Sequence, residues 1–474
     1  MKPNVSRIAV LCATSALLAA CGTTPVYQKP VVETPSAFKE STLWKSARSG
    51  TTTTPVQVPD TWWTLFNDPV LNDLQSGVAI GNENLKASAA QVQVARAALA
   101  TTRAGGSPVL GIGSGITYGA SGAGATPTTS NSIAANASWE LDLWGRVATA
   151  ESGAEARVQA SGADLEAARL SVQALLTQSY LALRSSEAQA DLLERSVVAF
   201  QRSLELTSNR YSAGVVSAAD VAQATTQLRA TQVQLIDTKA SRAQLEHAIA
   251  TLLGKPPAAF DLARTATLPK APEVPVQLPA QLLERRPDIA AAERRVAAAN
   301  AQIGVAQGAF FPAITLSGSA GFRSAGLLEL ISAPSLFWSL GPALALGLID
   351  GGARQAGVDS AKASVEQAAA SYRQTVLTAF QEVEDNLVAA SSLEEQIVLQ
   401  SDALKAAQRN LDIANNQYSA GIVSYLNVVT AQATALSSER SLMDLRNRRL
   451  VATALLLKNL GGQFNDTSRE PRKE

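Results

Sequence analysis

The strongest constraint on the fold is a segment that occurs twice in the chain. NRYSAGVVSAADV begins at Asn209, and NQYSAGIVSYLNV begins at Asn416. When these segments are aligned, the Leu-Gly pairs at 253–254 and 460–461 also coincide, and NENLKASAAQVQVARAAL falls opposite RPDIAAAERRVAAANAQI. A repeat that covers nearly the whole chain predicts a fold built from two copies of one structural unit.

Each copy has the same internal order: a helix, two strand-like runs, a very long helix, a tight turn and another helix. Proline is absent between Pro127 and Pro256 and again between Pro342 and Pro471, so a helix beginning near Gly145 can run for roughly 100 Å. Near its end, residues spaced alternately by four and three indicate coiled-coil packing. They are Leu193, Val197, Phe200, Leu204, Thr207 and Tyr211 in the first copy, and Leu404, Ala407, Leu411, Ala414 and Tyr418 in the second.

The N-terminus carries a targeting signal. Lys2 and Arg7 accompany an apolar run over 8–20 that is too short to span a bilayer. The run ends in Leu-Ala-Ala-Cys, which resembles a bacterial lipobox, so we expect cleavage before Cys21 and lipid attachment to it. Gly22 follows, which in such lipoproteins implies release to the outer membrane. The alternative is an ordinary signal peptide with an accidental cysteine. Cys12 would be removed with the signal, which leaves no thiol for a disulfide or a metal.

The predicted domain organisation follows from the repeat, the targeting signal and the prolines between the copies. We predict a signal peptide at 1–20, a lipidated N-terminal segment at 21–61, a first structural repeat at 62–258, a Pro-rich linker at 259–282, a second structural repeat at 283–464 and a C-terminal tail at 465–474.

Each copy also contains two segments in which apolar residues alternate with small or polar ones. They are SPVLGIGSGITYG, SIAANASWELDLWG, FPAITLSGSAGFR and SLFWSLGPALALGL. About ten alternating residues match the length of a tilted transmembrane strand. The apolar sets are Leu110, Ile112, Ile116 and Tyr118; Ile133, Ala135, Ala137, Trp139, Leu141 and Leu143; Ile314, Leu316, Ala320 and Phe322; and Leu336, Trp338, Leu340, Leu344, Leu346 and Leu348. The joining segments ASGAGATPTTSN and RSAGLLELISAP are expected to be exposed loops. A soluble antiparallel sheet with one wet face has the same period and is the alternative.

Four strands cannot close a membrane barrel, because the smallest such barrels have about eight. Open strand edges do not survive in lipid, so the barrel must be assembled from several chains. Closed symmetry gives eight strands in a dimer or twelve in a trimer, and the strand count alone leaves both open. Acidic and basic residues are equal in number at 40 each, so no nucleic-acid partner is expected.

The chain resembles the outer-membrane factors of the TolC superfamily, specifically their lipoprotein branch of OprM-like and NodT-like efflux channels. The segments that carry the resemblance are LLERRPDIAAAERRVAAANAQIGVAQGAFFPAITLSGSAG, SWELDLWGRV and the two Tyr-Ser-Ala-Gly turns. The resemblance implies a mainly α-helical homotrimer: a twelve-strand barrel in the outer membrane that continues as a coiled-coil tunnel across the periplasm. It also implies two partners, a periplasmic adaptor (membrane fusion protein) and an inner-membrane efflux transporter. One departure is visible, because Gly145-Arg146 at the first strand-to-helix junction becomes Gly352-Ala353 at the second.

The repeated turn has the residues of a helix–turn–helix. Gly214 and Gly421 can take the left-handed conformation that ends a helix, and Ser217 and Ser424 can cap the helix that follows. The resemblance implies that both turns lie at the periplasmic tip, where the tunnel is closed and where adaptor hairpins dock. Tyr211 and Tyr418 would accompany these glycines at the tip.

Asp220 has two compatible interpretations. It follows Ser217 by three, as in a capping box, and it is also a candidate gate acid, because family members place acids here facing the pore. In the second hairpin the family's acidic positions correspond to Asn427 and Thr430, and Leu426 matches a position that narrows the pore. We therefore hypothesise a gate of Leu426, Asn427 and Thr430, with Asp220 as the only nearby acidic ring, which would favour cations.

Other candidate sites are weaker. Arg285, Arg286, Pro287 and Asp288 match a family signature and read as a helix start with a structural role. His247, the only histidine, has no second His or Cys for a metal site, so neither a metal nor another cofactor is expected. Neither a nucleophile–base pair nor a pair of acids suggests an enzyme.

The leading hypothesis is a passive exit channel for small molecules such as drugs and toxic compounds, driven by its inner-membrane partner. It would lie in the outer membrane of a Gram-negative bacterium, be anchored by lipid and extend into the periplasm. One alternative is the outer-membrane duct of a type I protein-secretion system, against which lipidation and the Arg-Pro-Asp segment argue. The other is a non-conducting, envelope-spanning coiled-coil lipoprotein, against which the alternating strands argue.

Overall fold

The computed structural model describes residues 26–40, 59–120, 122, 124, 126–265, 267–272, 274 and 285–460. The chain divides into two compact units. The sheet unit comprises 1–32, 90–162 and 291–374, and the hairpin unit comprises 33–89, 163–290 and 375–474. The predicted signal peptide, Cys21 and the C-terminal tail lie outside the described residues, as does part of the predicted linker.

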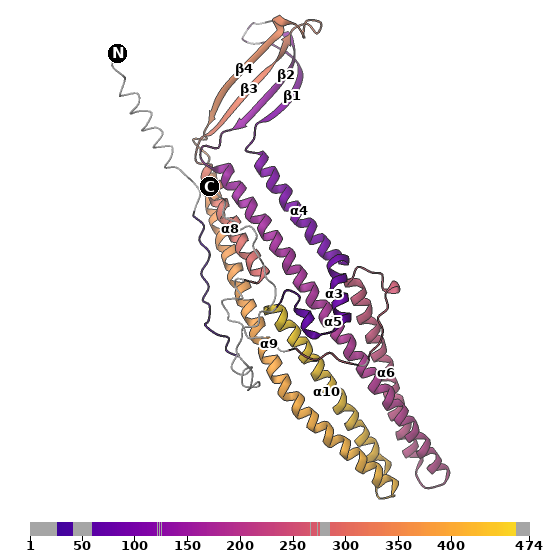
Figure 1. The fold of residues 1–474 in the computed structure, drawn as a ribbon. Coiled ribbons are helices and arrows are strands. Elements are labelled where there is room, and N and C mark those ends of the chain that lie inside the picture. Colours follow the sequence, from indigo (N-terminus) through magenta and orange to yellow (C-terminus); the bar gives the residue numbers. More distant parts are fainter. Residues whose placement is uncertain are drawn as a thin grey trace. The chain divides into compact units, whose positions relative to one another are not determined.

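The sheet unit contains one antiparallel sheet in the order β1-β2-β3-β4 (Figure 1). The strands are β1 (Val109–Gly119), β2 (Thr128–Glu140), β3 (Ala313–Ser324) and β4 (Leu336–Ala345). The first repeat supplies β1 and β2, and the second supplies β3 and β4, so the central pairing joins the two copies. Among the described strands, β1 and β4 each have a partner on one side only, which leaves two open edges.

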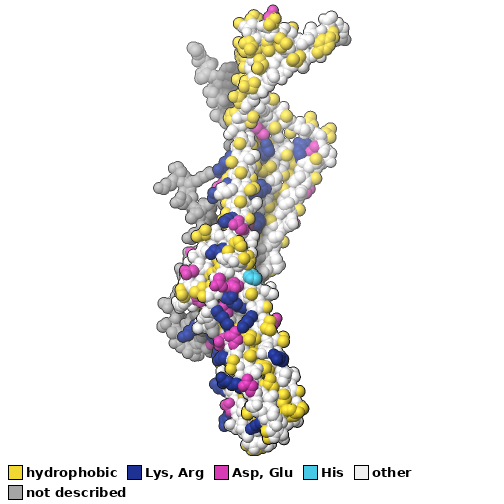
Figure 2. Space-filling view, turned by 90° about the vertical axis from the view of Figure 1, so that its right-hand side faces the viewer, with side chains coloured by type: hydrophobic (Ala, Val, Ile, Leu, Met, Phe, Trp, Pro, Cys, Tyr) yellow, Lys and Arg dark blue, Asp and Glu magenta, His cyan; other side chains and the backbone are white. Residues whose placement is uncertain are grey.

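The strand register places the predicted apolar positions on one face of the sheet. Leu110 pairs with Ala137, and alternate residues of a strand point to the same side. We call this side of the sheet the apolar face. It carries Leu110, Ile112, Ile116, Tyr118, Ile133, Trp139, Ile314, Leu316, Phe322, Leu336, Trp338, Leu340 and Leu344. The opposite, polar face carries Gly111, Gly113, Gly115, Thr117, Ser130, Ser132, Asn136, Ser138, Thr315, Ser317, Ser319 and Arg323. Within one chain the apolar face is uncovered, since Ile112 is 80% and Trp338 is 76% exposed. Figure 2 shows hydrophobic side chains over much of the sheet and charged ones gathered on the helices.

The strand boundaries differ from those predicted. Strand β2 begins at Thr128, so 128–131 belong to the strand and not to the loop. Leu141 and Leu143 lie beyond β2, and Leu346 and Leu348 lie beyond β4. At the end of β2 the cause is Asp142, whose carboxylate accepts hydrogen bonds from the amides of Val147 (3.0 Å) and Ala148 (2.8 Å) and so starts the next helix.

The helices follow the predicted order, except that two helices precede the strands of the first repeat where one was predicted. The first repeat contains η1 (Trp62–Phe66), α3 (Pro69–Gly81), α4 (Glu83–Ala104), α5 (Arg146–Ser212) and α6 (Ala218–Leu252), and the second contains α8 (Pro287–Gly308), η3 (Ala333–Ser335), α9 (Ala353–Ser419) and α10 (Tyr425–Leu460). A short η2 (Pro257–Ala259) begins the segment between α6 and α8, which we call the connector. Helices α5 and α9 each run unbroken for 67 residues, as the absence of proline predicts. None of the described helices is both long enough and apolar enough to cross a membrane.

The core of the hairpin unit contains the predicted coiled-coil stripe. Leu193 and Phe200 of α5 are buried against Leu228 of α6 and Leu436 of α10. In the second copy Ala407, Ala414 and Tyr418 are buried. The stripe of the first copy ends before Tyr211, which is exposed. The tyrosines that end the two stripes, Tyr211 and Tyr418, therefore differ in burial.

Two helix ends cross at backbone contact in the hairpin unit. A Cβ on Gly81 would lie 2.1 Å from the carbonyl oxygen of Leu253, and one on Gly254 would lie 2.1 Å from the carbonyl oxygen of Gly81. Gly254 has φ +67°, which ends α6 in the left-handed region. Asn82 bridges the crossing, donating to the carbonyl of Leu252 at 2.7 Å. We call this the Gly81–Gly254 crossing.

The strand-to-helix junctions differ between the repeats as the sequence departure suggests. In the first, Arg146 binds both carboxylate oxygens of Glu140 through one nitrogen, at 2.6 and 2.8 Å. In the second junction the arginine comes one residue later in the aligned sequence. This residue, Arg354, binds Asp350 at 2.6 Å. The ion pair is thus replaced locally, and the fold is unaffected.

Candidate functional site

Both hairpin tips are closed by the same backbone turn. Gly214 and Gly421 have φ of +74° and +76°, in the left-handed region that glycine adopts without a steric penalty. The bonds are those of a Schellman motif: Gly214 N–H donates to the Tyr211 carbonyl at 2.8 Å, and Val215 N–H donates to the Arg210 carbonyl at 2.9 Å. The second tip repeats both, from Gly421 to Tyr418 at 3.1 Å and from Ile422 to Gln417 at 2.9 Å. The repeated sequence is therefore a repeated helix-stop signal.

Asp220 forms the capping box that its spacing predicts. Its Oδ2 accepts hydrogen bonds from the amide and the hydroxyl of Ser217, both at 2.9 Å, and the Ser217 hydroxyl accepts from the Asp220 amide at 3.3 Å. The carboxylate is partly exposed, so a solvent-facing role remains compatible with capping. Ser424 precedes α10 directly, and the residue three positions later is Asn427, which supplies no acid there.

The predicted gate residues of the second hairpin face solvent in the single chain. Leu426 is 53% exposed, although it is apolar, and Asn427 and Thr430 are also exposed. The Thr430 hydroxyl donates to the Leu426 carbonyl at 2.9 Å. Within the described part of the chain, these three side chains are therefore left largely uncovered.

The two tip tyrosines are not equivalent, contrary to their equivalence in the sequence. Tyr211 is 49% exposed, whereas Tyr418 is 7% exposed and packs against Tyr425 with ring centroids 5.3 Å apart. The Arg210 guanidinium lies 4.8 Å from the Tyr418 ring centroid and donates to the Tyr418 carbonyl at 3.2 Å. Tyr425 also bonds Ser203 at 2.9 Å. These contacts join the two hairpin tips within one chain.

Arg210 and Tyr425 were missed by the sequence reasoning. The signal that could reveal them is the difference between the repeats, since their aligned counterparts are Gln417 and Ala218. Where two copies are otherwise alike, such a difference marks a contact that only one copy makes.

The Arg-Pro-Asp segment forms a charged link among three helices. Pro287 opens α8 as predicted. Arg286, 6% exposed, binds both oxygens of Asp288 at 3.0 and 2.7 Å and reaches Glu382 of α9 at 2.9 Å. Lys458 of α10 lies 3.9 Å from Glu382.

Burial acts to raise the pKa of the Asp288 carboxyl, but the hydrogen bonds and charge of Arg286 outweigh it, and the pKa lies below its ordinary value. Burial lowers the pKa of Lys458. Arg285 precedes this link and is half-buried. The segment holds helices together, which is the structural role expected for it.

Midway along the first hairpin, Glu187 is the centre of a buried ion cluster. It is fully buried and accepts from Arg184 at 2.7 Å, from Arg242 of α6 at 3.2 Å and from the amide of Thr265 in the connector at 3.1 Å. Arg184 also donates to the Ala263 carbonyl at 2.8 Å. The cluster thus ties α5, α6 and the connector together.

The second hairpin has the aligned counterpart of this pair. Glu394 of α9 lies 3.3 Å from Arg449 of α10, at the positions that match Glu187 and Arg242 when the repeats are superposed in sequence. Here about a third of each side chain is exposed, at 33% for Glu394 and 27% for Arg449. The glutamate of this pair is therefore fully buried in one copy and one-third exposed in the other.

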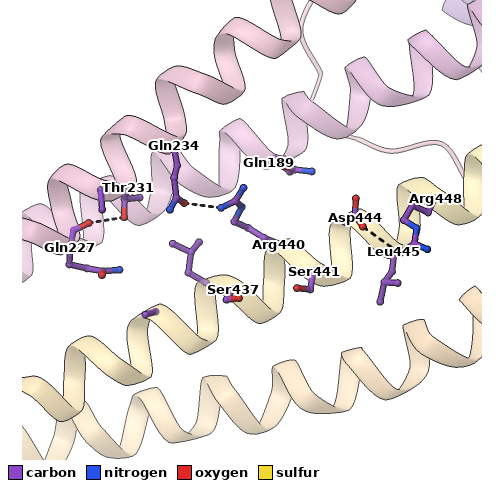
Figure 3. A pocket seen from close by; sticks show the side chains of 13 residues that line it. Gln189, Gln227, Thr231, Gln234, Ser437, Arg440, Ser441, Asp444, Leu445 and Arg448 are labelled. Atoms are coloured by element: carbon purple, nitrogen blue, oxygen red, sulfur yellow. Dashed lines mark hydrogen bonds and ion pairs between the residues drawn. The ribbon is translucent and has the colours of Figure 1, made fainter.

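A groove of about 690 Å³ lies between α6 and α10 in the hairpin unit (Figure 3). Arg440 of α10 donates across it to Gln234 of α6 at 2.9 Å, and Arg448 lies 3.9 Å from Asp444. The other lining residues are mostly amides, hydroxyls and small side chains: Gln189, Gln227, Ala230, Thr231, Ala433, Leu436, Ser437, Ser441 and Leu445. Both arginines are already engaged, so the groove is a polar seam between helices.

His247 is exposed on α6. Within the part of the chain that the structure describes, no three His, Cys, Asp or Glu side chains are grouped so as to hold a metal ion.

The chain matches the family model described as outer membrane efflux protein over residues 76–255 and 278–462. It is 31% identical to the probable efflux pump outer membrane protein SepC of Pseudomonas putida, over 99% of both chains. It is 30% identical to the cation efflux system protein CusC of Escherichia coli K12, over 94% of this chain and 97% of that protein. The names of other relatives mention toluene, antibiotics and pyoverdine. Its fold is similar to the solved outer-membrane channel OprN, with a TM-score of 0.86 and 28% identity over 93% of this chain and 99% of that one.

Proposed function

The chain belongs to the outer membrane efflux protein family, and on that premise we propose that three copies form the outer-membrane exit duct of a tripartite efflux pump. The observation that carries the proposal is the sheet: one apolar face is uncovered and two strand edges are open. Lipid would cover the face, and the β4 edge of one copy would pair with the β1 edge of the next. Twelve strands then enclose the polar face as a lumen.

The first experiment measures the native mass of the mature protein extracted from outer membranes in mild detergent. A trimer is expected, because four strands per copy then close into a barrel of ordinary size. A stable dimer would replace it with an eight-strand barrel. A stable monomer would leave open edges in lipid, and the barrel proposal would fail.

We place the periplasmic gate at the hairpin tips, with Leu426, Asn427 and Thr430 of each copy lining the narrow end and Asp220 as the acidic ring beside it. The exposure of these side chains in the single chain supports this placement. The Arg210–Tyr418 contact supports a further point, that the two tips of one copy move together. An adaptor protein docking on either tip would then displace both.

Replacing Asp220 with asparagine is expected to weaken cation preference. The substitution removes one negative charge per copy from the tip, while the amide oxygen can still accept the hydrogen bond from the Ser217 amide, so stability should change by less than about 1 kcal/mol. The measurement is the reversal potential across a KCl gradient in planar bilayers. The matched control is Asp237→Asn, which removes an exposed acid farther along the same helix. Equal reversal potentials for wild type and D220N would refute the gate-acid role.

The cargo is proposed by class only. Relatives named for toluene, antibiotics, cations and pyoverdine differ widely in what they export, so we propose small molecules delivered by the inner-membrane transporter.

We also propose that Cys21 carries the lipid anchor. Loss of labelling by a radioactive or clickable palmitate in Cys21→Ser would support it, and undiminished labelling would contradict it.

A further inference from the structure

The four strands and the loops that join them contain three charged residues, Glu140, Arg323 and Glu329. Glu140 ends β2 beside the helices, and Arg146 binds it at 2.6 Å, so its charge is compensated. Glu329 lies in the segment between β3 and β4. Arg323 is the one charged residue that lies within a strand away from the helix junction.

Arg323 lies on the polar face, near the end of the sheet farthest from the helices. It pairs with Ser132, which in turn pairs with Gly115, so its neighbours across the sheet are small and polar. It is the last but one residue of β3, next to the loop that leads to β4. Its side chain is exposed.

The charge of Arg323 is held in place but not neutralised. Its guanidinium lies 4.6 Å from the ring centroid of Phe337 on β4, which orients the side chain across the polar face by a cation–π contact. Among the described residues no carboxylate forms an ion pair with it. An aromatic ring fixes a cation without cancelling its field, so the positive charge remains available to a solute.

We propose that Arg323 makes the outer mouth of the channel an anion-binding ring. This inference rests on the proposed trimer, in which three copies of the polar face enclose the lumen and bring three Arg323 side chains to the same level. Membrane and protein walls of low dielectric focus the field of such a ring into the aqueous passage. The tip, with its Asp220 carboxylates, then attracts cations, whereas the outer mouth attracts anionic solutes.

The test uses a side-specific block, so that the gate at the other end does not mask the result. Inorganic tripolyphosphate is added to the barrel side of channels in planar bilayers, and the concentration that halves the current is measured. Arg323→Gln is expected to raise that concentration by about tenfold or more, because it removes three positive charges from the lumen. Arg323→Lys keeps the charge and is expected to stay within about threefold of wild type.

Ser319→Arg is the matched gain of charge, since Ser319 lies on the same face of β3, four residues before Arg323. It is expected to strengthen the block and to restore it in the R323Q background. Equal block of wild type and R323Q would overturn the inference while leaving a conducting trimer, and hence the proposed function, intact. A wild-type trimer that passes no current would overturn the proposed function, and the inference with it.

Discussion

Replacing Glu187 with glutamine is expected to lower the free energy of unfolding of the hairpin unit by about 3–5 kcal/mol. The carboxylate is fully buried between Arg184 and Arg242, and the substitution leaves the buried Arg184 guanidinium without its counter-ion, whereas Arg242 keeps Glu246 at 2.7 Å. It also weakens the bond that holds the Thr265 amide of the connector. The measurement is thermal unfolding of the purified protein by far-ultraviolet circular dichroism, together with its abundance in outer membranes.

The chain provides its own control for this prediction. Glu394→Gln removes the aligned acid of the second repeat, whose pair with Arg449 is partly solvated, and is expected to cost less than about 1 kcal/mol. The contrast depends on burial and on the second arginine, because the acid and its partner on the next helix are the same residue types in both repeats but Arg184 is replaced by Ser391. Equal losses for the two variants would show that burial of the Glu187 cluster does not set its contribution.

Replacing Gly81 with alanine is expected to lower the free energy of unfolding by about 3–5 kcal/mol. A methyl group there would lie 2.1 Å from the carbonyl oxygen of Leu253, which is backbone and cannot rotate away. Helices α3 and α6 would have to separate, and the Asn82 hydrogen bond to Leu252 would lengthen. The same thermal unfolding experiment measures the effect.

Gly162→Ala is the matched substitution. Gly162 lies inside α5, and apart from the neighbouring backbone of its own helix no atom lies within 4 Å of the position that its Cβ would occupy. Because alanine is the better helix former, this variant is expected to gain about 0.5–1 kcal/mol. If Gly81→Ala and Gly162→Ala behaved alike, close approach at the Gly81–Gly254 crossing would not be the reason for its glycines.

The elements of the fold that depend on local pattern could be predicted from the sequence. Helices α5 and α9 follow from the absence of proline, and the Gly214 and Gly421 turns follow from residue types that end and restart helices. The single apolar face of the sheet follows from alternation, because the period fixes which residues share a side. Strand ends were less accurate, since β2 stops where Asp142 begins to cap α5.

Contacts between distant segments could not be predicted in this way. Arg286 was assigned a structural role, but its partner Glu382 is 96 positions away and no spacing rule selects it. The Glu187–Arg242 pair was missed because each residue reads as an ordinary helix charge until two helix faces are brought together. Tyr211 and Tyr418 look alike locally, but Tyr418 is buried through contacts with other segments, among them Tyr425 and Arg210.

The pairing of β2 with β3 also has a consequence for the order of synthesis. Asn131 and Ser324, joined across these strands, are 193 positions apart, whereas β1 and β2 form a local hairpin. A growing chain therefore completes its first two strands long before the third exists, and β2 keeps an unpaired edge throughout that interval. Because such an edge is a template for pairing with other chains, the newly exported polypeptide needs a chaperone until β3 is available to pair with β2.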